Sequence, residues 1–173
     1  MYIKFIRAFT FVELIVCIAV LAIIASIAVP YFHQYFATLE ANHIHKRIKA
    51  AATYSRAQAA MLRQNIVICP SQSFAQCQPN QWKFGFLIFV DTNRNRQLDA
   101  NEQLMHIEQL NLKYGELDWR GALSIQSITY QSQTALPIGS NGSFYYCAYD
   151  PKNSQRIFLS KMGHTRMEPL INC

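Results

Sequence analysis

One carboxylate, Glu13, lies inside an apolar run of twenty-one residues, Phe9 to Val29, whose other polar members are Thr10 and Ser26. As a helix rising about 1.5 Å per residue, this run would be about 32 Å long, which matches a hydrocarbon core of about 30 Å. A charge buried in lipid is costly, so an acid there needs a cationic partner. The run therefore predicts a membrane-spanning helix, residues 9–29, that carries a carboxylate awaiting a cation.

A second group of oxygen-bearing side chains lies between residues 91 and 102. Positions 1, 3, 5, 9 and 12 of an EF-hand calcium loop correspond to Asp91, Asn93, Asn95, Asp99 and Glu102. The sixth position of such a loop needs Gly for its sharp turn, and here it is Arg96. Arg94 and Arg96 also offset the negative charge that attracts a dication. We therefore favour a hydrogen-bonded hairpin loop rich in Asp and Asn, with bound calcium as the alternative.

The five cysteines divide between the apolar run and the rest of the chain. Cys17 lies within the run, where we expect it to act as a small apolar residue. The other four are an even number beyond a membrane segment, which favours two disulfide bonds outside the cytosol. Of the three possible pairings we favour Cys69 with Cys77 and Cys147 with Cys173. Free buried thiols are the alternative, and zinc is disfavoured because no Cys-x2-Cys spacing occurs.

The helical pattern continues beyond Pro30, which we expect to kink the helix rather than to end it. We expect one helix of about 55 residues, from Phe9 to near Arg63, whose amphipathic continuation, residues 30–64, packs on a sheet. His43 and His45 are two positions apart and so do not share a helix face, which favours solvated surface over a metal site. The apolar stripe consists of Phe32, Tyr35, Phe36, Leu39, Ile44, Ile48, Ala52, Ala59 and Leu62.

Strand-like patterns fill the rest of the chain, residues 65–173. Runs of aromatic and branched residues alternate with turn clusters such as Ser140-Asn-Gly142. Short connections imply mostly antiparallel pairing, hence an α+β domain in which a long helix packs on a sheet. The predicted strands are Ile66–Cys69, Trp82–Val90, Leu104–Glu108, Leu123–Tyr130, Ser143–Tyr149, Arg156–Ser160 and Thr165–Pro169.

The start of the chain resembles the cleavage motif of type IV pilins and type II secretion pseudopilins. The residues that carry the likeness are Ala8-Phe9-Thr10-Phe11-Val12-Glu13-Leu14. In that family a prepilin peptidase removes a short leader, here residues 1–8 with Lys4 and Arg7, and methylates the new N-terminus. The resemblance implies cleavage between Ala8 and Phe9, although the family usually has Gly before the cut. Glu13 would then be the fifth mature residue, and the freed amino group of Phe9, in the same or a neighbouring subunit, would pair with it and set the register of assembly.

An ordinary secretory signal is the alternative to this processing. The end of the apolar run, Ala25-Ser-Ile-Ala-Val-Pro30, loosely offers a small-residue cleavage site. The carboxylate of Glu13 within the run argues against it, as does a run longer than the roughly 7–15 residues of a signal core.

Later patterns resemble the GspH/FimT/FimU branch of the pilin family. The likeness covers nearly the whole chain and implies a minor subunit near the tip of a filament rather than its bulk. The segments that carry it are Ser55–Arg63 with Ile66–Cys69, Trp82–Asp91 with the polar loop after it, Asn141–Cys147 and Ile157–Gly163.

The segment Lys161-Met-Gly-His-Thr-Arg166 resembles the Gly-Arg-x-Arg pattern through which FimT-type pilins of natural transformation contact DNA. Gly163 and Arg166 match this pattern, whereas His164 replaces its first Arg. Neutral His gives up a phosphate contact, so we expect any DNA binding to be weak, salt-dependent and stronger under acid. Lys152, Arg156 and Lys161 could supplement it. The alternative is a turn at Gly163 between two strands, with Arg166 solvated.

The sequence argues against an enzyme and implies no cofactor, because it contains no Gly-x-Ser-x-Gly, phosphate loop or His-Glu-x-x-His. Loss of Lys4 and Arg7 would lower the formal net charge from +6 to +4, which permits nucleic-acid binding without requiring it. We expect a FimT/FimU-like minor pilin, anchored in the bacterial inner membrane with residues 65–173 in the periplasm, that then joins a pilus tip. Its partners would be the prepilin peptidase, other minor and major pilins and, as a further option, DNA. A GspH-like pseudopilin of type II secretion is the alternative, and a membrane-anchored binding protein outside any filament is a third.

Overall fold

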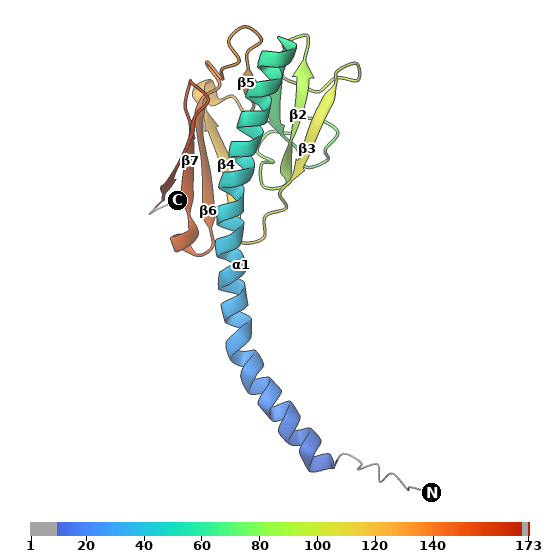
Figure 1. Cartoon of the computed structure of the whole chain (residues 1–173), viewed down its shortest axis with the longest axis vertical. Coiled ribbons are helices and arrows are strands. Elements are labelled where there is room, and N and C mark those ends of the chain that lie inside the picture. The colour runs from blue at the N-terminus through green and yellow to red at the C-terminus, as the bar shows by residue number, and fades with distance from the viewer. Residues whose placement is uncertain (1–9, 171–172) are drawn as a thin grey trace, which may run out of the picture. The chain divides into compact units, whose positions relative to one another are not determined.

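The computed structural model describes residues 10–170 and 173, which belong to two units. One unit ends at Phe36, and the other runs from Ala37 to Cys173. A single 52-residue helix, α1 (Phe11–Leu62), contributes to both units and continues through Pro30 (Figure 1). The long helix predicted from the sequence is thereby confirmed. The predicted leader and the cleavage pair Ala8 and Phe9 lie outside the described residues.

In the first unit, α1 exposes large apolar side chains on all sides, from Phe11 to Phe36. By length and composition the helix is able to cross a membrane. Its hydroxyl group at Ser26 donates to the carbonyl oxygen of Ile23 at 2.7 Å, so this polar side chain is satisfied within the helix. Apart from its few polar positions, the surface of this part of α1 is suited to lipid or to other helices.

In the second unit, α1 buries one stripe of mostly small side chains against two β-sheets (Figure 1). The buried positions recur at three- and four-residue spacings, and the alanines among them allow the helix backbone to approach the sheets closely. The buried positions are Ala37, Ala41, Ile44, Ile48, Ala51, Ala52, Ser55 and Ala59.

The described residues contain eight strands in two four-stranded antiparallel sheets. The first sheet has the order β3-β2-β1-β5 and the second the order β4-β6-β7-β8, so the chain crosses between the sheets before β4, after β4 and again after β5. The strands are β1 (Asn65–Pro70), β2 (Gly85–Asp91), β3 (Leu104–Gln109), β4 (Gly115–Gly121), β5 (Ile128–Tyr130), β6 (Gly142–Ala148), β7 (Gln155–Leu159) and β8 (Thr165–Pro169).

One apolar core joins α1 to the inner faces of both sheets. Aromatic rings dominate its centre: the ring centroids of Trp82 and Phe144 are 4.8 Å apart, and those of Trp119 and Phe144 are 4.5 Å apart. The indole N–H of Trp119 donates to the carbonyl oxygen of Ile125 at 2.9 Å, which satisfies a buried polar group. A smaller cluster lies on the other face of the first sheet and consists of Val67, Cys69, Leu87 and Phe89.

Two disulfide bonds tie the loops to this framework. Cys69 on β1 bonds to Cys77, and Cys147 on β6 bonds to Cys173 at the end of the chain. These are the two pairs that the sequence favours. Cys17 is exposed and unpaired within the apolar part of α1.

The strand predictions differ from the structure in three places, one of which is the predicted strand Trp82–Val90, whose first three residues form a turn before β2 begins at Gly85. The sequence-based interpretation misses β4, and it extends the strand Leu123–Tyr130 too far toward the N-terminus, since only β5 is a strand there. Leu123 instead lies in a 3₁₀ turn with a positive φ of 59°. The physical reason is that β4 is a half-buried strand with Leu117 and Trp119 inward and charged residues outward, and its glycines at both ends resemble turn signals. The strands also divide into two sheets, with β4, β6, β7 and β8 in the second, where the sequence-based interpretation expected one.

Candidate functional site

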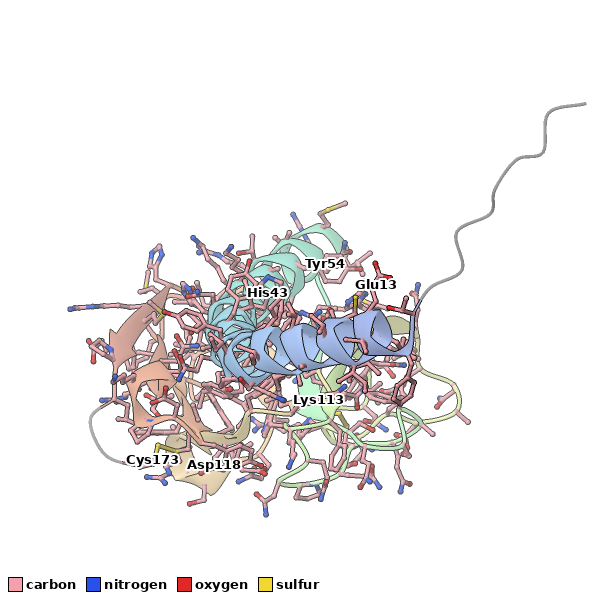
Figure 2. All side chains as sticks on the ribbon, turned by 90° about the horizontal axis from the view of Figure 1, so that it is seen from below. Glu13, His43, Tyr54, Lys113, Asp118 and Cys173 are labelled. Carbon is pink, nitrogen blue, oxygen red and sulfur yellow. A yellow bond between two sulfur atoms is a disulfide. The ribbon has the colours of Figure 1, made fainter. Side chains whose placement is uncertain are left out.

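The start of α1 presents the carboxylate-bearing residue Glu13 on an apolar surface. The backbone N–H of Glu13 donates to the side-chain oxygen of Thr10 at 3.2 Å, so Thr10 caps the helix. The side chain of Glu13 is exposed and projects from the first turn of α1 (Figure 2). The flanking Val12 and Leu14 are also exposed. An anion set among exposed apolar groups is suited to a cationic partner outside this helix.

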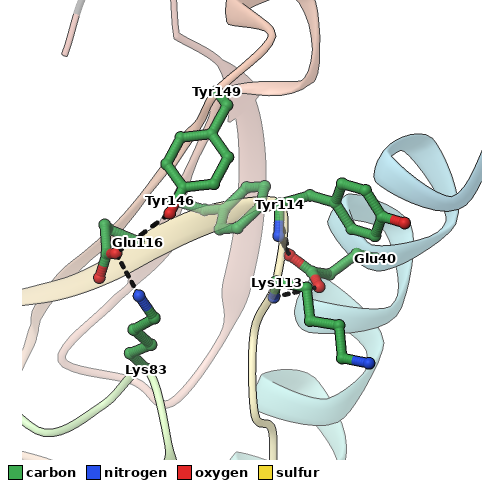
Figure 3. A network of polar contacts seen from close by, with 7 residues as sticks. All are labelled: Glu40, Lys83, Lys113, Tyr114, Glu116, Tyr146 and Tyr149. Carbon is green, nitrogen blue, oxygen red and sulfur yellow. Dashed lines mark hydrogen bonds and ion pairs between the residues drawn. The ribbon is translucent and has the colours of Figure 1, made fainter. Parts of the chain in front are cut away.

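A second carboxylate of α1, Glu40, binds the helix to the β-domain (Figure 3). Its oxygens accept the backbone N–H groups of Lys113 at 2.8 Å and Tyr114 at 3.0 Å. The hydroxyl of Tyr146 on β6 donates to the same carboxylate at 2.8 Å. Burial, together with this hydrogen bond, raises the pKa of Tyr146, so its hydroxyl remains a donor. The sequence-based interpretation missed this contact. The available signal was the rarity of acids in α1, which contains only Glu13 and Glu40.

A second polar contact joins the helix to the second sheet. The side-chain amide of Gln155 on β7 donates to the carbonyl oxygen of Ala41.

His43 is exposed (Figure 2), as the sequence predicts, whereas His45 is partly buried and its Nε2 has no hydrogen-bond partner among the described residues. Burial, followed by the charge of Lys49, lowers the pKa of His45. Thus His43 and His45, two positions apart in the sequence, have different environments.

The polar loop between β2 and β3 is held together by its own hydrogen bonds. The amide groups of Asn93 and Asn95 each donate to Asp99 Oδ2 at 2.8 Å. Glu102 accepts the backbone N–H of Thr92 at 2.8 Å. Arg94 and Arg96 both adopt a positive φ, where glycine is usual.

Asp91, the first residue of the candidate calcium set, is only 2% exposed. Its two carboxylate oxygens accept the backbone N–H groups of Asn95 and Arg96, both at 3.2 Å. Burial raises the pKa of Asp91, although these backbone hydrogen bonds oppose the shift. The arrangement is that of an Asx-type hairpin loop in which carboxylates accept from the loop itself; calcium binding stays an untested alternative.

The candidate DNA segment forms the hairpin turn between β7 and β8. The backbone N–H of Ser160 donates to His164 O at 2.9 Å, and Gly163 has a φ of +77°. The side chain of Arg166 is 77% exposed and forms an ion pair with Glu168, with 3.3 Å between Nε and Oε1. Lys161 and His164 are exposed on the turn. The three candidate residues therefore lie on one hairpin, with an acid beside Arg166.

Arginine and aromatic side chains gather on the exposed face of the second sheet, next to Arg166. Strand register places Arg120, Tyr145, Arg156 and Phe158 on this face, in alternation with buried core residues. The guanidinium carbon of Arg120 lies 4.4 Å from the ring centroid of Tyr145, and that of Arg156 lies 5.9 Å from that of Phe158. Among these residues the sequence-based interpretation named only Arg156. The signal that could have found the others is the two-residue alternation of a strand, which puts every second side chain on the same face of a sheet.

The fold and the start of the helix together define a type IV pilin-like protein: an exposed apolar helix with one early carboxylate, continued by a segment that packs on antiparallel sheets. Comparison with known families agrees. Residues 46–163 match the type II transport protein GspH, and residues 4–29 match the prokaryotic N-terminal methylation motif. The chain belongs to the GspH family.

Solved structures of similar fold include the type IV minor pilin FimU of Pseudomonas aeruginosa in two crystal forms. One is 15% identical, covers 75% of this chain and 89% of FimU, and has a TM-score of 0.54. The other is 16% identical, covers 74% of this chain and 92% of FimU, and has a TM-score of 0.51. No curated protein matches the chain. The chain is accordingly a minor pilin or pseudopilin, of the class that is processed by a prepilin peptidase and associates with other pilins.

Proposed function

We propose that this chain is a minor pilin of a type IV pilus that helps to start filament assembly and stays in the tip complex. The observation that carries the proposal is the carboxylate of Glu13 in the first turn of an exposed apolar helix. The methylation motif over residues 4–29 supports cleavage between Ala8 and Phe9, and the likeness in fold to FimU supports the pilus over other filaments. In the membrane-bound state, residues 65–173 face the periplasm.

In this proposal the charge of Glu13 sets the position of the subunit along the filament. The amino group of Phe9 becomes free after cleavage and pairs with Glu13 of the same or a neighbouring subunit. A subunit inserted one helical turn out of place would leave the carboxylate unpaired in an apolar core, at a cost of several kcal/mol. Apolar packing of the helices then supplies most of the attraction, while the ion pair selects the register.

The test is the isosteric change Glu13→Gln, which removes the charge and keeps the size of the side chain. Its matched control is Ser26→Ala, at a polar position of the same helix that is already satisfied by Ile23. We expect Glu13→Gln to abolish incorporation into pili and Ser26→Ala to retain it. Mass spectrometry of the mature protein should find N-methylated Phe9. Normal incorporation of the Glu13→Gln protein, or a native chain that starts elsewhere, would contradict the proposal.

The alternative is a minor pseudopilin of a type II secretion system, which the match to GspH favours. A deletion mutant separates the two functions. Loss of surface pili with normal export of secreted proteins supports the pilus, whereas the reverse result supports the secretion system.

DNA binding at the β7–β8 hairpin is a second candidate function. The observation that favours it is the exposed side chain of Arg166 beside the arginine and aromatic face of the second sheet. Such surfaces combine phosphate contacts with base stacking. The full-length protein should retard DNA in a gel at low salt, Arg166→Ala should abolish the shift, and the control Arg94→Ala, in an exposed loop of the other sheet, should retain it. No shift at low salt would end this candidate.

A further inference from the structure

A cavity of about 220 Å³ lies on the side of the first sheet where the smaller apolar cluster is buried. Three segments meet there: the disulfide loop after β1, the polar loop between β2 and β3, and the segment that leads into β5. The residues that line the cavity include none of the start of α1 or of the β7–β8 hairpin. Besides the disulfide, its lining includes Pro70, Gln78, Pro79, Arg96, Gln126 and Ser127.

Two polar atoms of the lining residues are buried without a hydrogen-bond partner among the described residues. One is the donor Nη1 of Arg96, and the other is the acceptor Oε1 of Gln126. A guanidinium is always charged, and a buried polar group without a hydrogen-bond partner destabilises the folded state. A ligand that offered an anionic acceptor and an N–H donor would remove both costs.

Hydrogen bonding within the polar loop fixes the backbone of Arg96. Its backbone N–H donates to the buried carboxylate of Asp91 at 3.2 Å, and its φ of +63° is one that glycine adopts more easily. Arg94 in the same loop has a φ of +64°, but it is exposed and does not line the cavity. The two arginines thus share charge and backbone conformation and differ in their relation to the cavity.

The charges around the cavity select the ligand. Of the described residues that line the cavity, Arg96 alone is charged, and none carries a carboxylate. The two acids of the loop on either side of Arg96 already accept hydrogen bonds from the loop itself. Asp91 accepts the backbone N–H groups of Asn95 and Arg96. Asp99 accepts the amide groups of Asn93 and Asn95. Guanidinium groups bind carboxylates through paired N–H donors. In a polypeptide, a carboxylate lies close to a backbone N–H. That N–H is the kind of donor that Gln126 Oε1 lacks.

We propose that this cavity binds a carboxylate carried by a polypeptide, with Arg96 donating to the carboxylate and Gln126 accepting an adjacent amide N–H. Because both atoms are shielded in the present conformation, binding requires the two side chains to turn toward the ligand. The proposal rests on the proposed function only for the origin of the polypeptide, which would be an acidic side chain or chain end of a neighbouring pilin-like subunit.

The test is calorimetric titration of the full-length protein in detergent with short peptides. Acetyl-Gly-Asp-Gly-amide presents a side-chain carboxylate, acetyl-Gly-Gly-Gly with a free C-terminus presents a chain end, and acetyl-Gly-Asn-Gly-amide is the neutral control. Free acetate shows whether the carboxylate alone is sufficient. We expect at least one acidic peptide to bind at millimolar concentration or below, and the neutral peptide to bind at least about tenfold more weakly.

Two matched variants connect binding to the cavity. Arg96→Gln should weaken binding of the acidic peptide at least about tenfold, whereas Arg94→Gln, with the same loss of charge, should leave it unchanged. Equal thermal unfolding of the two variants shows that both are folded. Absence of binding, equal binding of the neutral peptide, or equal losses in both variants would overturn the proposal. These outcomes do not depend on Glu13, so this site and the pilus assignment can fail separately.

Discussion

The carboxylate of Glu40 on α1 accepts a hydrogen bond from the hydroxyl of Tyr146 on β6, with 2.8 Å between the two oxygens. The same carboxylate accepts two backbone N–H groups from the connection that leads into β4. The two acids of α1 therefore differ in kind: Glu40 is satisfied inside its own domain, whereas Glu13 is exposed on the apolar part of the helix.

Replacing Glu40 by Gln should destabilise the domain. Glutamine has one acceptor oxygen, and its amide group would meet donors that Glu40 now satisfies, so we expect a loss of about 2 kcal/mol in the free energy of unfolding. Urea unfolding of the purified protein in detergent measures this loss. The control Glu116→Gln, at a half-exposed ion pair with Lys83 (Figure 3), should have a much smaller effect. Equal effects would show that Glu40 has no special role.

Acid should destabilise the protein through His45. Because burial lowers the pKa of His45 in the folded state, the unfolded chain takes up the proton first as the pH falls. Stability should therefore decrease as the pH falls from about 6.5 toward the lower folded-state pKa. The variant His45→Gln should flatten the dependence of the free energy of unfolding on pH in this range. The exposed His43→Gln serves as the control, and a flattening of the same size in that variant would contradict the prediction.

A side chain at Gly163 should weaken the β7–β8 hairpin. Its φ of +77° is unfavourable for L-residues, while a new Cβ would make only ordinary van der Waals contacts, with the nearest atom 3.6 Å away. Gly163→Ala should therefore cost about 1 kcal/mol through the backbone alone. Gly163→Asn should cost less, because Asn tolerates this conformation better. Thermal unfolding compares the two variants, and a larger loss for Asn would point to crowding instead.

Calcium should not stabilise the polar loop. Since Asp99 accepts the amide groups of Asn93 and Asn95, the loop supplies its own donors. We expect the melting temperature to stay the same with millimolar calcium or with a chelator. Asp99→Ala should lower stability by about 1 kcal/mol, and Asp118→Ala, on the surface of the second sheet, should have little effect (Figure 2). A calcium-dependent rise that disappears in Asp99→Ala would favour a metal site.

The elements with strong periodic patterns were predictable. The helix, the continuously apolar β1 and β2, and the closing strands were found from the sequence, as were the pairs Cys69–Cys77 and Cys147–Cys173. The strand β4 was missed because its alternation is short and is bounded by Gly115 and Gly121. Assignment of strands to two sheets depends on contacts between distant segments, and no local pattern contains them.

The amino-acid sequence alone predicts a membrane-spanning helix, because an apolar run of twenty-one residues matches the thickness of a bilayer. The resemblance of Ala8–Leu14 to the pilin cleavage motif then indicates the class of protein. The sequence also placed the candidate residues Glu13 and Arg166. Two further features became visible in the folded protein: Glu40 joins the helix to β6, and Arg96 lines the same cavity as Gln126. Such contacts join residues far apart in the chain, and their energies depend on burial and hydrogen-bond geometry that exist only after folding.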